Sequence, residues 1–545
     1  MLALIAGLVL TFTVSAAIMA GAIKAQQSVK SSYYQSMVRY GAETQLLQDK
    51  QDLKRFGLVQ LLRRRSGGLA AFGCSFNVMG VVGCSAFLLG PALEQGGPSI
   101  IGFGLPILAL FSLAVSASIA ELASAVPTAG GIYHATSVLG GRSWGRRAGY
   151  LQALGHLAML SLLNSSCAVL LEAFLSEKFG YEASVMSFWC VVAGLTALQG
   201  AVHHWGVSVM GLLQAGGVWL QALTAICMLG GLVWLFWPGG YSPAILYHFM
   251  NAEFSGKVHA GAFITGTLLL LKLFLGMDGA SHVAEETMDP RIRAPWAIYL
   301  STSYVYVIGI AMLTFMLLTA AIPLQSDGAG VFMQAAAAGW EGSAVIAGLI
   351  LLSLWFSGLQ SMGSCSRILY SLARDRELPF NRRWSAVSER RQSPLQAVWL
   401  SAAGAIAMIV AVYTFMGGGY LPILLSIAIV CLHLSYAIPI SLKLIKGRQN
   451  RLLLDAPWRL GSWSIPVNGV SLAWLMSTAV LTSMFIHPAG AVSAAVSLLL
   501  AAAWGMRGLR GLRRLKLKDG TALEMKKENT GNIQTIPKKF PGEAQ

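Results

Sequence analysis

The chain has 545 residues, of which 55% are apolar and 11% are charged, and its formal net charge is +16. With a mean hydropathy of +0.62, it has less than half the charged share of an ordinary soluble protein, which is about 25%. Repeated apolar stretches of roughly 20 residues, each long enough to cross the hydrocarbon core of a bilayer, indicate an all-α polytopic membrane protein.

Residues 1–23 are apolar and long enough to span, but they lack the basic flank of a secretory signal. Two interpretations stay open: an accessory thirteenth span, or a start codon upstream of the functional one. Residues 24–66 then form a cytoplasmic segment before the core. Hydropathy places twelve spans after it, at 67–92, 98–122, 146–173, 184–202, 206–237, 260–287, 295–322, 342–373, 396–416, 419–445, 468–486 and 488–506.

The distribution of positive charge predicts the orientation of these spans. If residues 24–66 lie inside, all 39 Lys and Arg residues except Lys178, Lys257 and Lys272 are assigned to the cytoplasmic side. Both flanks of the core are therefore expected in the cytoplasm, with the chain in the plasma (cell inner) membrane. The basic tail 507–545 favours anionic membrane lipid over nucleic acid. The seven cysteines form no C-x-x-C pair, and no metal site or cofactor is predicted.

Two of the spans, 67–92 and 260–287, are interrupted by glycines near their middle. Corresponding breaks five helices apart are typical of an inverted-repeat transporter whose site lies at the membrane midplane. The repeats would be 67–237 and 260–445, followed by two helices within 468–506. A broken helix exposes amides that favour anions and carbonyls that favour cations, and an amino acid carries both charges. The predicted substrate-binding residues are Gly80, Gly83, Cys84, Ser85, Phe274, Gly276, Met277, Asp278 and Gly279.

Five motifs carry a resemblance to a known family. They are GPALEQGGPS (90–99), AELASAVPTAGGIYHA (120–135), GMDGASHVAEETMDP (276–290), SRILYSLARDRELPF (366–380) and SPLQAVWLSA (393–402). The chain resembles the amino acid–polyamine–organocation superfamily, and within it the amino acid/choline transporter branch, over about residues 48–507. The resemblance implies a leucine-transporter-type fold of 5+5 inverted repeats plus two helices. It also implies secondary-active uptake of amino acids or related amines.

The chain departs from the superfamily pattern at three places that bear on the coupling ion and the substrate. The G-x-G usual in the first break is Gly83-Cys84-Ser85 here. The hydroxyl pair that holds sodium in sodium-coupled relatives falls on Gln360 and Ser361, which leaves one hydroxyl and disfavours sodium. Lys272 stands where this branch commonly has an aromatic residue. A proton is therefore the predicted coupling ion, with sodium as the alternative.

Three ionisable residues of the sixth span have competing interpretations. Lys272 lies about 18 Å into the span at 1.5 Å per residue, too deep to reach either surface easily. We expect it to turn inward, either as the titrating group of proton coupling or as a fixed brace. Asp278 precedes the second half of the helix, as a helix N-cap, as a contact for the substrate amine or the coupling ion, or as both. His282 follows one turn later and is either part of a proton path or of a polar stripe.

The cytoplasmic ends of the spans supply candidate gate residues. Asp375 closes the 342–373 span, and Arg63, Arg64 and Arg65 precede the first span, so an ion pair between them is predicted to shut the inner side. Glu121 lies near the same interface. We expect it to pair with the amides, or with a base, of the PTAGG turn that follows.

The predicted function is secondary-active import of amino acids or γ-aminobutyrate-like amino acids, coupled to protons. The alternative is a choline or polyamine permease of the same fold. A choline site needs an aromatic cage, and Lys272 would repel a cation if it faced the site. A channel or a membrane-embedded enzyme is a remote alternative, because polar residues are spread one per helix and do not converge at one depth. No phosphate-binding loop for ATP occurs.

Overall fold

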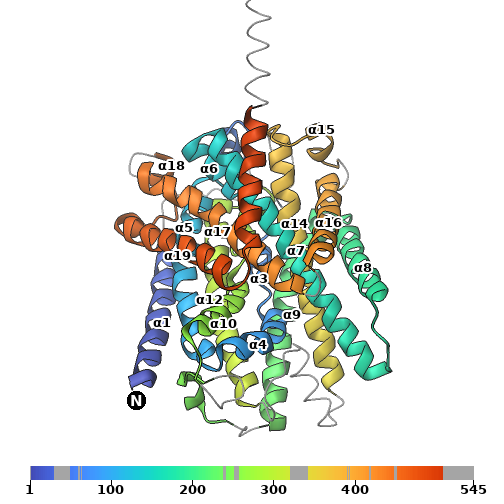
Figure 1. Ribbon diagram of the computed structural model, residues 1–545. Coiled ribbons are helices and arrows are strands. Elements are labelled where there is room, and N and C mark those ends of the chain that lie inside the picture. The colour runs from blue at the N-terminus through green and yellow to red at the C-terminus, as the bar shows by residue number, and fades with distance from the viewer. Residues whose placement is uncertain are drawn as a thin grey trace, which may run out of the picture. The chain divides into compact units, whose positions relative to one another are not determined.

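The computed structural model of the protein describes residues 2–29, 49–58, 62, 64, 66–236, 241–250, 257–319, 342–388, 391, 393–416, 419–446 and 451–506. Within these ranges every named element is a helix, which confirms the predicted all-α class (Figure 1). The chain divides into two units, Met1–Leu498 and Leu499–Gln545. The first unit holds both glycine-interrupted spans. In the second, residues 499–506 are helical.

Thirteen helices in the described part of the chain are long and apolar enough to cross a membrane. One of them is α1 (Leu2–Val29), and the others match the twelve predicted spans. These are α3 with α4 (Gly68–Met79, Val81–Gly96), η1 with α5 (Ile100–Gly104, Leu105–Ala125), α7 (Arg142–Phe179), α8 (Val185–His203), α9 (Val207–Phe236), α10 with η3 and α11 (Ala260–Leu270, Leu271–Phe274, Gly279–His282), α12 (Pro290–Leu318), α14 (Ser343–Arg374), α16 (Leu395–Met416), α17 (Tyr420–Lys446), α19 (Ser464–Phe485) and Ala489–Met506.

The α1 helix packs beside α5 and α12 (Figure 1). The hydroxyl of Tyr299 donates a hydrogen bond of 2.6 Å to the carbonyl of Ala17. Gly21 lets the Tyr299 ring approach, because a Cβ at this position would lie 1.8 Å from a ring carbon. Most other described side chains of α1, between Ala3 and Ile23, are exposed, as expected of a helix whose outer face meets lipid. An accessory thirteenth span fits this packing.

Packing around α7 brings distant parts of the chain to the two interrupted helices. The α7 helix contacts both α14 and α17, while α3 contacts α9, α12 and α14. The short helix α6 (Ile132–Gly140) also lies on α7. The sixth span ends earlier than predicted, at His282 instead of 287. The interruptions fall in the first and sixth spans, as the sequence predicts, and the 5+5 inverted repeat itself stays a prediction.

Candidate functional site

The first break is a single residue, Gly80, which has left-handed backbone angles of φ 60° and ψ 48°. Helix α3 ends before it and α4 begins after it, so Gly83, Cys84 and Ser85 lie in the first turns of α4. A Cβ on Gly80 would lie 2.1 Å from the hydroxyl of Ser357 in α14. Glycine is therefore required at position 80 both for its backbone angles and for the close approach of α14.

The second break is longer and begins where α10 gives way to the 3₁₀ helix η3. Leu275 is extended, and Gly276 has a positive φ of 85°. A Cβ on Gly276 would lie 2.2 Å from Val78, and one on Gly279 would lie 2.9 Å from the carbonyl of Cys74. The two glycines thus let the sixth span touch the end of α3, and the two breaks meet in space.

Asp278 occupies the N-cap position of α11, but its side chain makes no capping hydrogen bond. The capping interpretation is therefore wrong. The hydroxyl of Ser75, from α3, accepts instead from the amide of Ala280 at 2.8 Å. The carboxylate of Asp278 is fully buried and turns toward α7 and α17. It accepts hydrogen bonds of 2.6 Å from Gln152 and 2.6 Å from Tyr436.

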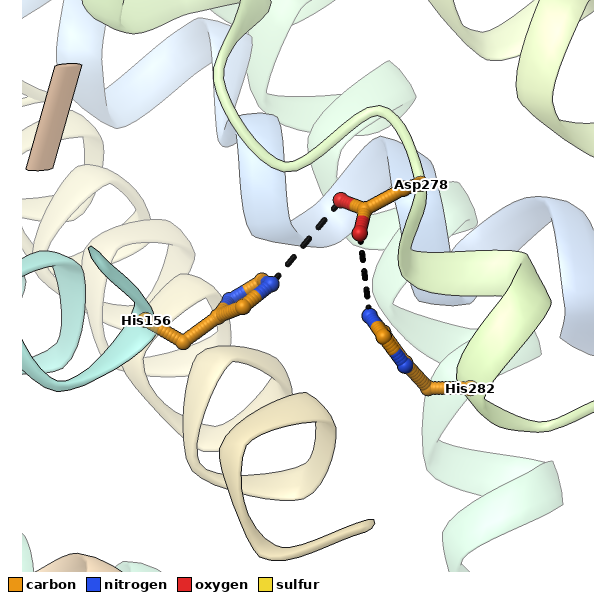
Figure 2. Close-up of side chains that lie close together, drawn as sticks. All are labelled: His156, Asp278 and His282. Carbon is orange, nitrogen blue, oxygen red and sulfur yellow. Dashed lines mark hydrogen bonds and ion pairs between the residues drawn. The ribbon is translucent and has the colours of Figure 1, made fainter. Parts of the chain in front are cut away.

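Two histidines flank the Asp278 carboxylate, one from each side (Figure 2). His282 Nε2 lies 3.0 Å from Asp278 Oδ2, one helical turn along the same element. His156 Nε2, from α7, lies 3.8 Å from Oδ1, which is within ion-pair distance but beyond hydrogen-bond reach. No sequence pattern grouped His156 with the sixth span. The only local signal was the pair Gln152 and His156, which lie one turn apart on the same helix.

Lys272 turns inward and is 1% exposed, as its depth predicts. Its Nζ lies 3.1 Å from the carbonyl of Met79, 3.5 Å from that of Val78 and 3.4 Å from the sulfur of Cys84. Met79 is the last residue of α3, so the ammonium sits at the negative end of that helix dipole. Lys272 thereby joins the two broken helices directly.

The remaining predicted residues of the site are buried. Phe274 and Met277 are 1% and 2% exposed. The hydroxyl of Ser361 donates to the carbonyl of His156 at 3.3 Å, and Gln360 accepts from Gln214 at 3.3 Å. These contacts run to α7 and α9, whereas the α14 hydroxyl nearest the first break is that of Ser357.

A family model described as amino acid permease matches residues 67–505, which is most of the chain. The chain belongs to the amino acid permease family. The permease is 25% identical over 458 residues to amino-acid permease BAT1 of Arabidopsis thaliana, covering 79% of this chain and 87% of that protein. It is 26% identical to amino-acid permease 2 of Neurospora crassa, covering 77% and 79%.

A third relative is an uncharacterized amino-acid permease of Schizosaccharomyces pombe, 28% identical over 460 residues, covering 80% of this chain and 81% of that protein. The permease is therefore an integral, multi-pass membrane transporter of amino acids, and not an enzyme. The family resemblance carried by the five sequence motifs is confirmed.

On the predicted cytoplasmic side, two adjacent glutamates of the permease reach two arginines of α14. Arg367 holds Glu286 through both of its carboxylate oxygens, at 2.8 Å and 3.0 Å. Arg374 holds Glu285 at 3.1 Å and 3.2 Å. Glu285 also accepts from the amide of Ala129 in the PTAGG turn at 3.0 Å. Burial raises the pKa of Glu285, but the Arg374 guanidinium outweighs it and holds this pKa below its ordinary value of 4.5.

Asp375 and Arg64 have different partners in this structure. Asp375 accepts from the hydroxyl of Tyr133 at 2.7 Å and lies 3.1 Å from His134 Nε2. Arg64 donates to the carbonyls of Ala284 and Thr287, at 3.1 Å and 2.8 Å. Arg63 and Arg65 lie outside the described residues. An ion pair between Asp375 and the arginines at positions 63 to 65 therefore stays a prediction. The observed partners of the Asp375 carboxylate, Tyr133 and His134, come from α6.

We expect Asp375→Ala to loosen this contact between α14 and α6. Burial raises the pKa of Asp375, but His134 and the Tyr133 hydroxyl hold it below its ordinary value of 3.8. The stabilisation is thus present at neutral pH and is lost only when pH falls below that value. Because the Asp375 side chain is 27% exposed, we expect this contact to stabilise the closed arrangement of α14 and α6 by about 0–1 kcal/mol. The measurement uses a background in which every cysteine except Cys74 is replaced. Chemical labelling of the Cys74 thiol should become up to about fivefold faster in Asp375→Ala.

Glu94→Ala is the matched control, since Glu94 is an exposed carboxylate near the far end of α4. Its Cys74 labelling rate should equal that of the parent protein. Equal rates in Asp375→Ala and Glu94→Ala would remove Asp375 from the inner gate.

Proposed function

We propose that this permease imports amino acids with a free carboxylate across the plasma membrane, with both flanks of its core in the cytoplasm, and that protons drive the uptake. The observation that carries the proposal is the position of Lys272, whose ammonium joins the end of α3 to the sixth span. The proposal places the substrate between the two breaks.

The two breaks offer complementary charge to a zwitterion. The first backbone amides of α4, which follow Gly80, have no carbonyl acceptor in a preceding turn of the same helix. They therefore favour a carboxylate. The carbonyls freed where η3 ends, at the extended residue Leu275, favour an ammonium group. Lys272 adds a positive charge beside α3, which favours an amino acid or a γ-aminobutyrate-like acid over choline or a polyamine.

Lys272 is also the residue we propose for coupling. In the described part of the chain no carboxylate lies within ion-pair distance of its Nζ, and its partners are carbonyls and a thiol. A buried ammonium without a counter-ion is costly, so loss of its proton is a realistic step in a transport cycle. Protonated Lys272 would hold α3 against the sixth span, and deprotonated Lys272 would release it.

Two substitutions distinguish a role of Lys272 in proton coupling from a purely structural role in holding the two broken helices together. Lys272→Arg keeps a cation that cannot be deprotonated in proteins, and Lys272→Met removes the charge. In proteoliposomes we expect Lys272→Arg to keep the exchange of labelled amino acid at equal pH on both sides. It should lose accumulation driven by a pH gradient, which for one proton and one pH unit is about tenfold. A fixed brace instead predicts near-normal accumulation in Lys272→Arg and loss of folded protein in Lys272→Met.

Accumulation by Lys272→Arg with the pH dependence of the parent would assign coupling to another group. The substrate is tested separately, by thermal-shift measurements with amino acids, γ-aminobutyrate, choline and putrescine. A ligand that binds only the folded state raises the unfolding temperature. A shift with choline or putrescine alone would contradict the proposed substrate class.

A further inference from the structure

The three residues drawn in Figure 2 form a compact set of donor atoms inside the permease. One ring nitrogen of His156, one of His282 and a carboxylate oxygen of Asp278 all lie within 4.8 Å of one another. All three side chains are 0% exposed. Asp278 and His282 are one turn apart on the sixth span, and His156 comes from α7, so the set bridges two separate helices.

Three of the four ring nitrogens of the set, both of those in His156 and Nδ1 of His282, have no hydrogen-bond partner among the described residues. The fourth, Nε2 of His282, lies 3.0 Å from Asp278 and 3.4 Å from the Gln152 amide. Buried polar atoms are seldom left in this state, because an unpaired donor or acceptor loses its bonds to water without compensation. The simplest explanation of His156 is a ligand that binds between it and Asp278.

The donor types select the class of ligand. Two imidazoles and one carboxylate are typical of sites for zinc and related first-row transition metals, whereas magnesium and calcium prefer oxygen donors. Bonds of about 2.1 Å place tetrahedral ligand atoms roughly 3.4 Å apart. The donor atoms therefore need to approach one another by on the order of 1 Å to hold such an ion.

A second set of residues already orients the carboxylate. Gln152 donates to Oδ2 of Asp278, and Tyr436 donates to Oδ1. Partners of this kind fix the orientation of a metal ligand and raise affinity in known sites. They come from α7 and α17, and α7 also carries His156.

We propose that His156, Asp278 and His282 form a binding site for a transition-metal cation of the zinc class, and that occupancy inhibits transport. The bound ion ties the second break to α7 and prevents the sixth span from moving relative to that helix. Because the site is buried in this structure, the ion enters when the permease opens during its cycle. The proposal rests on the transport function of the family and is independent of how uptake is coupled.

The test uses the purified full-length permease with zinc chloride, and with magnesium and calcium chloride as comparisons. We expect zinc to raise the unfolding temperature and to inhibit exchange of labelled amino acid in proteoliposomes, with EDTA reversing both effects. Equilibrium dialysis should find one zinc ion that is lost in His156→Gln. That variant breaks no hydrogen bond made by the imidazole among the described residues, so it is expected to fold. His282→Gln is the second variant.

His433→Gln is the matched control, because His433 is also a buried histidine in a span, but its Nδ1 lies 2.6 Å from the Thr478 hydroxyl in another part of the fold. The zinc concentration for half-inhibition should rise at least tenfold in His156→Gln and in His282→Gln, and should not change in His433→Gln. Zinc binding and zinc inhibition that persist in both His156→Gln and His282→Gln would overturn the proposal. So would equal stabilisation by magnesium.

Discussion

Arg367→Met is expected to lower the stability of the folded permease by about 3–5 kcal/mol, the usual effect of removing one partner of a buried ion pair. The side chains of Arg367 and Glu286 are 2% and 1% exposed, and their two hydrogen bonds are 2.8 Å and 3.0 Å long. Without the guanidinium, the Glu286 carboxylate remains buried without its counter-charge. Its desolvation is then uncompensated, and this causes most of the loss.

The measurement is the temperature at which half of the purified protein stays monodisperse in detergent. Arg55→Met is the matched control, since Arg55 is 59% exposed and lies 3.5 Å from Asp52. The control should change stability by less than about 1 kcal/mol. The double variant Glu286→Leu/Arg367→Met should recover much of the loss, because it buries no unpaired charge. A double variant as unstable as the sum of the two single variants would show that the pair acts independently.

Gly276→Ala is expected to reduce amino acid uptake at least tenfold while leaving membrane insertion unchanged. Gly276 has a φ of 85°, and a Cβ there would lie 2.2 Å from a methyl group of Val78. The strained backbone and the clash together cost on the order of 1–3 kcal/mol. This strain falls where the sixth span touches the end of α3, so it displaces the carbonyls to which Lys272 donates.

Uptake in proteoliposomes at matched protein density measures this effect. Gly348→Ala is the control, because Gly348 lies in α14 and has no atom within 4 Å of the position its Cβ would take. This variant should transport at the parent rate. If Gly276→Ala also transports at that rate, the second break does not need its observed shape for function, and the substrate site must be sought elsewhere.

The outcome for Asp278 illustrates what sequence spacing can and cannot predict. Its place between Gly276 and the start of a helical turn predicted a cap, since Asp is a favoured N-cap residue. The structure gives the capping bond to Ser75, and the carboxylate turns to Gln152 and Tyr436. These partners are 126 and 158 residues away in the chain, so no local pattern could identify them.

Glu121 shows the same limit. We expected it to pair with the PTAGG turn directly after it. In the structure it pairs with Lys443 of α17 and accepts from the amide of Leu460 at 2.8 Å. The turn amide of Ala129 is instead bonded to Glu285. A sequence reveals that a buried carboxylate needs donors, but several donors satisfy that need equally well, and helix packing selects among them.

The sequence by itself determined the all-α class, the twelve core spans and the interruption of the first and sixth. Each of these depends on local properties: the length of an apolar run and the backbone freedom of glycine. It also determined that Lys272 turns inward, because its depth in the span allows no other low-energy position. Only the tertiary structure decided which groups meet, namely Lys272 with the end of α3 and His156 with Asp278. The physical reason is that these contacts join helices far apart in the chain, and their partners are chosen by how the helices pack.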